Sequence, residues 1–206
     1  MSMQHAENFD CRKCGRVTAF TIHQTINVTH EPEYRDKVLD MSLFQFQCRY
    51  CGFSAIVHYC PLYHDMTRQY MLQVCVDENA ARNNNLAEFL PNYTLQKYRL
   101  RSVVGYDELT EKIRIFDTGL DDYVIEAIKS VIVNQNPDTS SVYFMELSDN
   151  QLAFSRLYDN DEYQEALGVP YHAYLDIEQR IQAMTAVRPQ KYLYVDRQFI
   201  GHLQYS

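Results

Sequence analysis

The chain has 206 residues, 46% of them hydrophobic, so it is long enough to bury a substantial core. Its formal net charge of -8 at pH 7 disfavours nucleic-acid binding, because that affinity comes largely from cationic groups that displace counterions. The first residues show no export signal, and no apolar stretch approaches the ~20 residues that cross a bilayer, so we expect a cytoplasmic protein.

Two segments in the first third of the chain share the pattern Cys-x-x-Cys-Gly, at residues 11–15 and 48–52. Two intervening residues let a tight turn present both sulfurs to one ion, and the glycine suits the positive φ with which such a turn ends. Four thiolates leave no open position for water or substrate, so the pattern predicts a structural zinc ion. The expected ligands are Cys11, Cys14, Cys48 and Cys51.

Other interpretations of these cysteines stay open at this point. An iron–sulfur cluster uses similar ligands, and the spacing does not separate iron from zinc. A redox dithiol would sit at the start of a helix after a strand, and neither pair has that context. The gap from Cys14 to Cys48 exceeds the ~15 to 20 residues of a compact zinc ribbon, so an insertion must separate the two turns.

The segments around these pairs predict a small β module with one inserted helix. Val17–Ile22 and Ile26–Thr29 are rich in the β-branched residues of strands. Pro32 suits the first turn of a helix, which we expect over Glu33–Asp40. Three more strands are expected, the first two as a hairpin around the second cysteine pair: Leu43–Gln47, Phe53–Tyr59 and Gln69–Val76.

His58, His64 and Asp65 lie in a short segment that we expect to be a proline-containing turn. Two imidazoles and a carboxylate would form a hydrolytic centre or a second metal site if they converged on an open position. The simpler interpretation, which we favour, is that His64 and Asp65 hydrogen-bond the backbone of the turn and brace it. These three residues are the first candidates for catalysis if a reaction exists.

The composition turns to Asn, Ala and Glu over Asp77–Asn92, which indicates a loop or short helix between two parts. We therefore expect a module over residues 1–76 and a second domain over residues 77–206. Pro170 indicates the start of a helix late in that domain.

The second domain is expected to mix strands and helices without regular βαβ alternation, so the fold class is α+β. Helices are predicted over Asp107–Thr118, with Gly119 as the stop, and from Asp121 or Asp122 onward. The predicted strands are Leu95–Val104, a hairpin of Val142–Leu147 with Gln151–Tyr158, and one or two closing strands over Lys191–Leu203.

Two further groups of side chains attract attention. Asp117, Asp121, Asp122 and Glu126 resemble a metal-binding carboxylate patch, but helix capping is the simpler explanation. Tyrosine suits surfaces that are apolar and still form hydrogen bonds, so a partner surface near the C-terminus is a hypothesis beside core packing. The tyrosines concerned are Tyr171, Tyr174, Tyr192, Tyr194 and Tyr205.

Several stretches resemble the CpXC protein family, a bacterial and archaeal domain named for two Cys-Pro-x-Cys pairs. The resemblance runs from Cys11 through Val74 and, less distinctively, through Glu111–Phe116 and Gly119–Asp122 to Lys129. The most specific stretches are Ile26–Thr29, Ser42–Phe44, Cys48–Gly52 and Pro61–Met66.

The chain departs from the family pattern because Arg12 and Arg49 stand where the family name calls for proline. The stiffening of each turn by proline is lost, and two positive charges are placed beside a negatively charged tetrathiolate centre. The resemblance implies a zinc-ribbon-like module and a metal, and it implies no activity.

The favoured hypothesis is a binding or scaffold protein stabilised by structural zinc, with a protein partner or self-association. A hydrolytic enzyme that uses His58, His64 and Asp65 is the alternative, although the familiar catalytic motifs are missing from the sequence. A nucleic-acid-binding ribbon is the third hypothesis. Its local cations are Arg12, Lys13, Arg16, Arg49 and Arg68.

Overall fold

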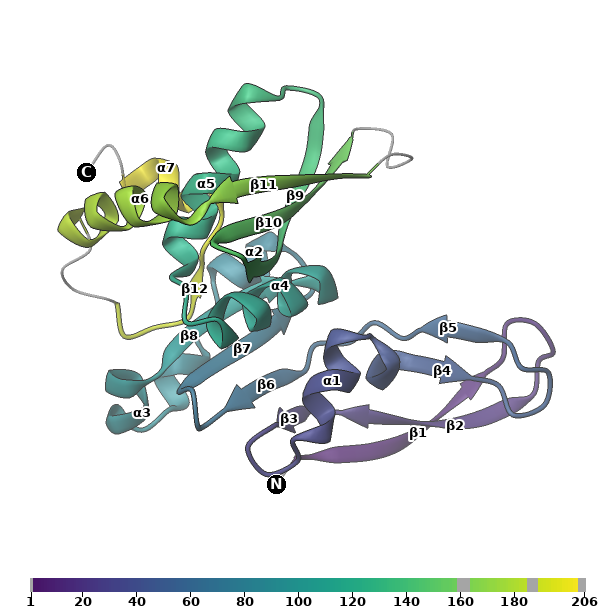
Figure 1. The fold of residues 1–206 in the computed structure, drawn as a ribbon. Helices are drawn as coiled ribbons and strands as arrows, with labels where there is room; N and C mark the ends of the chain where they lie inside the picture. The colour runs from purple at the N-terminus through teal and green to yellow at the C-terminus, as the bar shows by residue number, and fades with distance from the viewer. Residues whose placement is uncertain (1, 159–163, 185–188, 204–206) are drawn as a thin grey trace.

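The structure, a computed structural model, describes residues 2–158, 164–184 and 189–203. It contains both helices and sheets, which confirms the α+β class. An N-terminal arm extends to one side of a larger body, and the strands and helices of that body are packed around one another (Figure 1). Within the described ranges, no helix has the length and apolar character that a membrane crossing requires.

The arm consists of two antiparallel ribbons. β1 (Gln4–Asp10) pairs with β2 (Val17–His23), and β4 (Gln45–Gln47) pairs with β5 (Ser54–Ile56). The loops that close the two ribbons lie together at the far end of the arm (Figure 1). The strand expected from residue 17 and the hairpin around the second cysteine pair are thereby confirmed.

Aromatic side chains from both ribbons form a small core inside the arm. The ring centroids of Phe9 and Phe20 are 5.8 Å apart, and each lies within 6.3 Å of the Phe46 ring. Cys11 and Cys48 are buried against this group. A core of this size cannot offset the conformational entropy of two short ribbons, so the arm needs a second source of stability.

The inserted segment leads from the arm into the body. α1 (Glu33–Leu39) begins directly after Pro32, as the sequence predicts, and the 3-10 helix η1 (Ser42–Phe44) precedes β4. Val38 and Phe44 are completely buried in the main core. The insertion therefore anchors the arm to the body.

The body is built on a five-stranded mixed sheet in the order β12-β8-β7-β6-β3. β6 and β7 run antiparallel, and the other neighbouring pairs run parallel. Its strands are β3 (Thr25–Asn27), β6 (Leu62–Asp65), β7 (Tyr70–Cys75), β8 (Arg99–Val104) and β12 (Leu193–Tyr194).

This sheet continues across the division expected between residues 76 and 77. β7 pairs with β8 over six residues, from Tyr70 opposite Arg99 to Cys75 opposite Val104. One hydrophobic cluster also extends across this division, from Ile26 to Ile200. The division into 1–76 and 77–206 stays a prediction. Strands on its two sides are hydrogen-bonded to each other in one sheet.

Helices and a second sheet complete the body. β9 (Thr139–Ser148), β10 (Gln151–Tyr158) and β11 (Gln164–Pro170) form an antiparallel sheet of three strands. Asp149 and Asn150 close the predicted β9–β10 hairpin with φ of 48° and 60°, the two positive values of a type I′ turn. The helices are α2 (Glu78–Arg82), α3 (Asn92–Lys97), α4 (Gly105–Asp117), α5 (Asp122–Gln135), α6 (Tyr171–Met184) and α7 (Arg197–Leu203), with the 3-10 helix η2 (Leu86–Phe89).

Three expectations about elements were wrong. Of the segment expected to be a turn, residues 58–61 are irregular and Leu62–Asp65 is strand β6, because it adds to the edge of β7. The predicted strand from Leu95 begins only at Arg99, since the residues before it form α3 after Pro91. The predicted closing strands shrink to β12, and the rest of that segment is α7, whose start is capped by Asp196.

Candidate metal centre and charged cavity

The two Cys-x-x-Cys-Gly segments fold into the same turn. The N–H of Gly15 donates to the Cys11 carbonyl at 2.8 Å, and the N–H of Gly52 donates to the Cys48 carbonyl at 2.9 Å. The two glycines have φ of 68° and 69°, a conformation that side-chain-bearing residues rarely adopt. The positive φ expected after each pair is therefore present, and identical local chemistry produces identical backbone geometry.

The turns bring all four sulfurs together at the end of the arm. Cys11 Sγ lies 3.6 Å from Cys51 Sγ, and Cys14 Sγ lies 3.7 Å from Cys48 Sγ. All four sulfurs lie within 4.8 Å of one another. A tetrahedron with metal–sulfur bonds of about 2.3 Å has edges of about 3.8 Å. The donor set therefore fits one tetrahedral ion bound by all four thiolates.

The thiols of the second pair differ in acidity. Burial opposes ionisation of Cys48, but backbone N–H groups of Tyr50 and Cys51 and the Thr18 hydroxyl lower its pKa to about 6. The N–H of Phe53 favours the Cys51 thiolate, yet burial and the neighbouring sulfurs raise the pKa of Cys51 to about 11. Four thiolates thus require a cation among them, and metal binding is coupled to proton release.

The side chains of His58, His64 and Asp65 do not converge on one site. Successive strand residues point to opposite faces, so His64 and Asp65 on β6 cannot converge. The His58 ring stacks on Tyr106 at 5.5 Å between centroids. His64 Nε2 is buried without a hydrogen-bond partner among the described residues, and its ring lies 5.3 Å from that of Tyr98.

Asp65 has a bracing role. Its carboxylate accepts the backbone N–H of Arg68 at 2.8 Å and the Arg68 guanidinium at 2.9 Å, across the turn between β6 and β7. This is the arrangement that the bracing interpretation expects of Asp65, and it does not extend to His64. The carboxylate is already engaged in a charge-assisted contact.

Capping explains one of the four carboxylates considered as a patch. Asp121 accepts the N–H of Tyr123 at 3.0 Å and caps α5. Asp117 instead pairs with Arg35 and Arg68, whereas Asp122 and Glu126 pair with cations elsewhere. The four carboxylates do not form a metal site: within the described ranges, the four cysteines are the one group of metal ligands that gathers around a common point.

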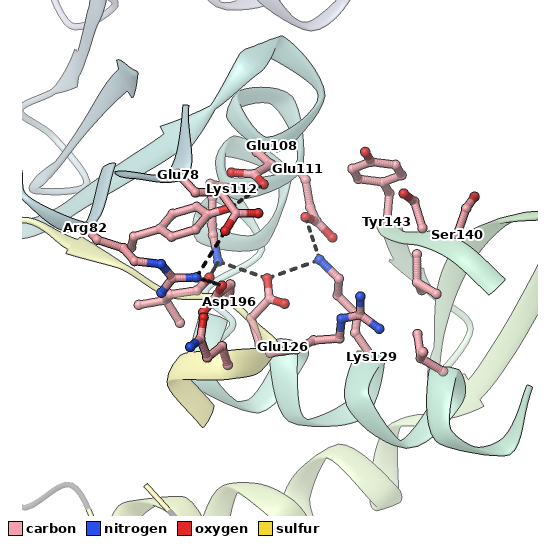
Figure 2. Close-up of a pocket in the computed structure, with 17 residues that line it drawn as sticks. Glu78, Arg82, Glu108, Glu111, Lys112, Glu126, Lys129, Ser140, Tyr143 and Asp196 are labelled. Carbon is pink, nitrogen blue, oxygen red and sulfur yellow. Dashed lines mark hydrogen bonds and ion pairs between the residues drawn. The ribbon is translucent and has the colours of Figure 1, made fainter. Parts of the chain in front are cut away.

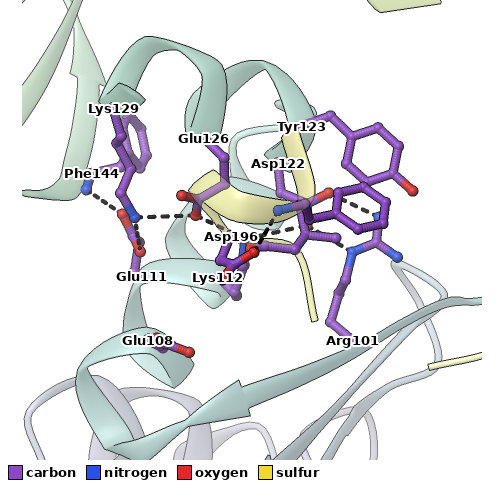
Figure 3. Close-up of polar contacts among 12 residues, drawn as sticks. Arg101, Glu108, Glu111, Lys112, Asp122, Tyr123, Glu126, Lys129, Phe144 and Asp196 are labelled. Carbon is purple, nitrogen blue, oxygen red and sulfur yellow. Dashed lines mark hydrogen bonds and ion pairs between the residues drawn. The ribbon is translucent and has the colours of Figure 1, made fainter. Parts of the chain in front are cut away.

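Six buried side chains form a continuous chain of alternating charge inside the body (Figure 3). In order along the contacts they are Arg101, Asp122, Lys112, Glu126, Lys129 and Glu111. At one end the guanidinium binds both oxygens of Asp122, at 2.7 and 2.9 Å. At the other end Glu111 accepts Lys129 at 2.9 Å and the N–H of Phe144 at 2.6 Å.

Lys112 and Glu126 join the two ends. Lys112 Nζ donates to Glu126 at 3.2 Å and to the Val195 carbonyl at 3.1 Å, and it forms an ion pair with Asp122 at 3.3 Å. Glu126 also accepts Lys129 at 3.1 Å. Charges are this deeply buried only where each is paired, because an isolated buried ion carries a large desolvation cost.

The pairing of Asp122 predicts a pH dependence of stability. Burial alone would raise the pKa of Asp122, but Arg101 and Lys112 outweigh it and hold the pKa well below the ordinary value of 3.8. The resulting stability is complete above about pH 4 and is lost as the pH falls toward the lower folded-state pKa. Between pH 4 and 2, the free energy of unfolding should lose up to about 1.4 kcal/mol per pH unit through this group. Urea unfolding of Asp122→Asn between pH 4 and 2 should show a free energy of unfolding that falls less steeply with pH than in the parent protein. Equal pH dependence in the two proteins would contradict this role of Asp122.

A cavity of about 540 Å³ opens beside this charged chain (Figure 2). Its walls come from α2, α4, α5, β9, and the segment from β12 into α7. Lining side chains with polar groups include Glu78, Arg82, Glu108, Glu111, Lys112, Glu126, Lys129, Ser140, Ser141, Tyr143, Tyr194, Asp196, Arg197 and Gln198. Its volume falls in the range of small-molecule sites, and its lining is far more polar than most.

Only the spacing of charged residues on two helices could have indicated this cavity from the sequence. Glu108 and Lys112 are four residues apart on α4, and Asp122, Glu126 and Lys129 follow one face of α5. Charges at such intervals usually lie on a solvated face. Here β9 and the β12–α7 segment cover that face, so the contacts that bury these groups come from residues distant in the sequence.

The fold and the site define an α+β protein with four clustered cysteines, a group compatible with a metal site, at the end of a β arm. The family model described as CpXC protein matches residues 9–129, which is more than half of the chain. The chain therefore belongs to the CpXC family. Neither a curated protein nor a solved structure matches it. The matched region includes both cysteine pairs and all six residues of the charged chain.

Proposed function

We propose that the four cysteines bind a single structural zinc ion and that this ion holds the arm in shape. The observation that carries the proposal is the closed set of four sulfurs, which leaves no coordination position for a substrate. The sulfur separations support one ion, because a cluster of two or four iron atoms would divide the thiolates among different iron atoms and hold some of the sulfurs farther apart than 4.8 Å. All six cysteines are free thiols, which suits a reducing compartment such as the cytoplasm.

We further propose that the zinc-bound end of the arm is a docking surface for an acidic segment of a protein partner. Four exposed cations surround the two turns: Arg12, Lys13, Arg16 and Arg49. The guanidinium carbons of Arg16 and Arg49 lie 5.0 and 4.8 Å from the ring centroid of Tyr50, which is 46% exposed. Aromatic and arginine side chains together are typical of binding hot spots.

Two features favour a protein partner over nucleic acid. The cations are confined to the end of the arm, since Arg68 lies in the body and pairs with Asp65 and Asp117. The chain as a whole carries a net charge of -8, which repels an extended polyanion. A short acidic segment avoids that repulsion. The catalytic alternative has no comparable support, because His58, His64 and Asp65 do not face a common point.

A binding assay with defined probes tests the docking surface. A fluorescent Asp/Glu-rich peptide and a single-stranded oligonucleotide of equal charge are titrated against the zinc-loaded protein. We expect the peptide to bind more tightly, and Arg16→Ala/Arg49→Ala to weaken it by about 1 kcal/mol, or roughly fivefold in Kd. Lys37→Ala, on an exposed position of α1, is the matched control. Tighter oligonucleotide binding with a steep salt dependence would replace this proposal with nucleic-acid recognition.

A further inference from the structure

The lining of the cavity carries more negative than positive charge. It contains five carboxylates, which are those of Glu78, Glu108, Glu111, Glu126 and Asp196. It contains four cationic side chains, which are those of Arg82, Lys112, Lys129 and Arg197. The one additional carboxylate favours binding of a cation over an anion in the cavity, because opposite charges attract strongly at partly buried sites.

One carboxylate of the lining has no cationic partner. The charged chain beside the cavity is balanced, with three carboxylates and three cations. At the rim, Arg82 binds both Glu78 and Asp196. Among the described residues, Glu108 has no cationic nitrogen within 4.0 Å.

Two hydrogen bonds nevertheless fix the orientation of the Glu108 carboxylate. One carboxylate oxygen accepts the Tyr194 hydroxyl at 2.9 Å, and the other accepts the backbone N–H of Val104 at 2.7 Å. Burial raises the pKa of Glu108. Neutral donors thus orient this carboxylate without neutralising it, so a ligand cation would supply the missing charge.

A bare metal ion does not fit this part of the cavity. Within the described ranges, the carboxylates of the lining do not gather closely enough to share an ion, whereas the four cysteines do. The space of about 540 Å³ instead suits an organic molecule. Its cationic group would need donor hydrogens for carboxylate oxygens, as an ammonium group has.

The opposite end of the cavity offers hydroxyl groups. Ser141 and Tyr143 are two residues apart on β9 and therefore share a face of the strand. Figure 2 shows Tyr143 and Ser140 across the cavity from Glu78 and Asp196, with Lys129 and Glu111 between them. Hydroxyl groups both donate and accept hydrogen bonds, so this end suits ligand hydroxyls.

We propose that this cavity binds a small hydroxylated amine, with its ammonium group at Glu108 and its hydroxyl groups toward Ser141 and Tyr143. This site is separate from the zinc-bound arm, and its occupation does not depend on the docking surface proposed above. The proposal assigns binding only, since no reacting group is placed against the ligand.

Three sugars with one skeleton and different charges test the proposal by calorimetry on the full-length, zinc-loaded protein. Glucosamine carries an ammonium group, glucose is neutral and glucuronate is anionic. We expect glucosamine to bind in the millimolar range or tighter, glucose more weakly, and glucuronate most weakly. Glu108→Gln should weaken glucosamine at least about tenfold, because a charge-assisted hydrogen bond becomes a neutral one.

Two further variants separate loss of binding from loss of the fold. Ser141→Phe fills the hydroxyl end and should abolish glucosamine binding without touching Glu108. Glu88→Gln removes an exposed carboxylate on η2 outside the cavity and should leave binding unchanged. Each variant must retain the melting temperature of the parent. Equal binding of the three sugars, preference for glucuronate, or no binding of glucosamine would overturn the proposal.

Discussion

Replacing Cys48 with serine is expected to remove the metal and unfold the arm. Structural zinc contributes about 10–16 kcal/mol of apparent binding free energy in small zinc-bound peptides, far more than the aromatic core of the arm supplies. Elemental analysis should find less than one metal ion per chain. Hydrogen exchange should show rapid labelling of Gln4–Asp10, Val17–His23, Gln45–Gln47 and Ser54–Ile56, while β7 and β8 remain protected.

Cys60→Ser is the matched control, because Cys60 is an exposed free cysteine outside the cluster. It should retain one metal ion per chain and the protection of the arm. A chelator added to the parent protein should reproduce the exchange pattern of Cys48→Ser. If Cys48→Ser kept a protected arm, the aromatic core alone would be sufficient and the metal would have another purpose.

Replacing Lys112 with methionine should produce the largest loss of stability in the body. Lys112 is 3% exposed by side chain and lies between two carboxylates that are also buried. The variant removes one cationic partner from Asp122 and one from Glu126. Removal of one partner from a buried ion pair lowers the free energy of unfolding by about 3–5 kcal/mol. That is a large part of the ~5–15 kcal/mol by which a typical domain is stable.

Urea unfolding measures this effect, with Lys97→Met as the control at an exposed lysine of α3. The control should change the free energy of unfolding by less than about 0.5 kcal/mol. A loss below about 1 kcal/mol in Lys112→Met would contradict a stabilising role of Lys112 between Asp122 and Glu126.

The cysteine cluster was predictable because its signal is local. Each Cys-x-x-Cys-Gly segment contains the sulfurs, the turn and the glycine that ends it, and the structure reproduces that turn twice. The helix after Pro32 and the hairpin at Asp149 and Asn150 were predictable for the same reason. In each case a few neighbouring residues determine the backbone conformation.

Strands without a hydrophobic pattern escaped prediction. β1 has almost entirely exposed side chains and exists as a strand through its pairing with β2. β11 likewise depends on the edge of β10. Conversely, the apolar segment after Lys191 resembled strands, although Asp196 before Phe199 was an available capping signal for α7. Strand formation depends on a partner edge that the sequence of one segment does not contain.

The tyrosines near the C-terminus are largely core residues. Tyr174, Tyr192 and Tyr194 are buried, and Tyr171 stacks on Tyr174 at 5.4 Å, whereas Tyr205 lies outside the described residues. The hydroxyls explain the choice of tyrosine: Tyr194 donates to Glu108, and Tyr174 donates to Glu178. The contact of Tyr194 with Glu108 was not predictable, since the two residues are 86 positions apart in the sequence.

X-ray absorption spectroscopy at the zinc edge, combined with metal stoichiometry, tests whether the four cysteines bind one zinc ion. We expect one zinc per chain surrounded by four sulfur atoms at about 2.3 Å, with no oxygen or nitrogen ligand. A zinc site with fewer than four sulfurs, or a purified protein whose arm is fully protected from exchange without any metal, would contradict this expectation.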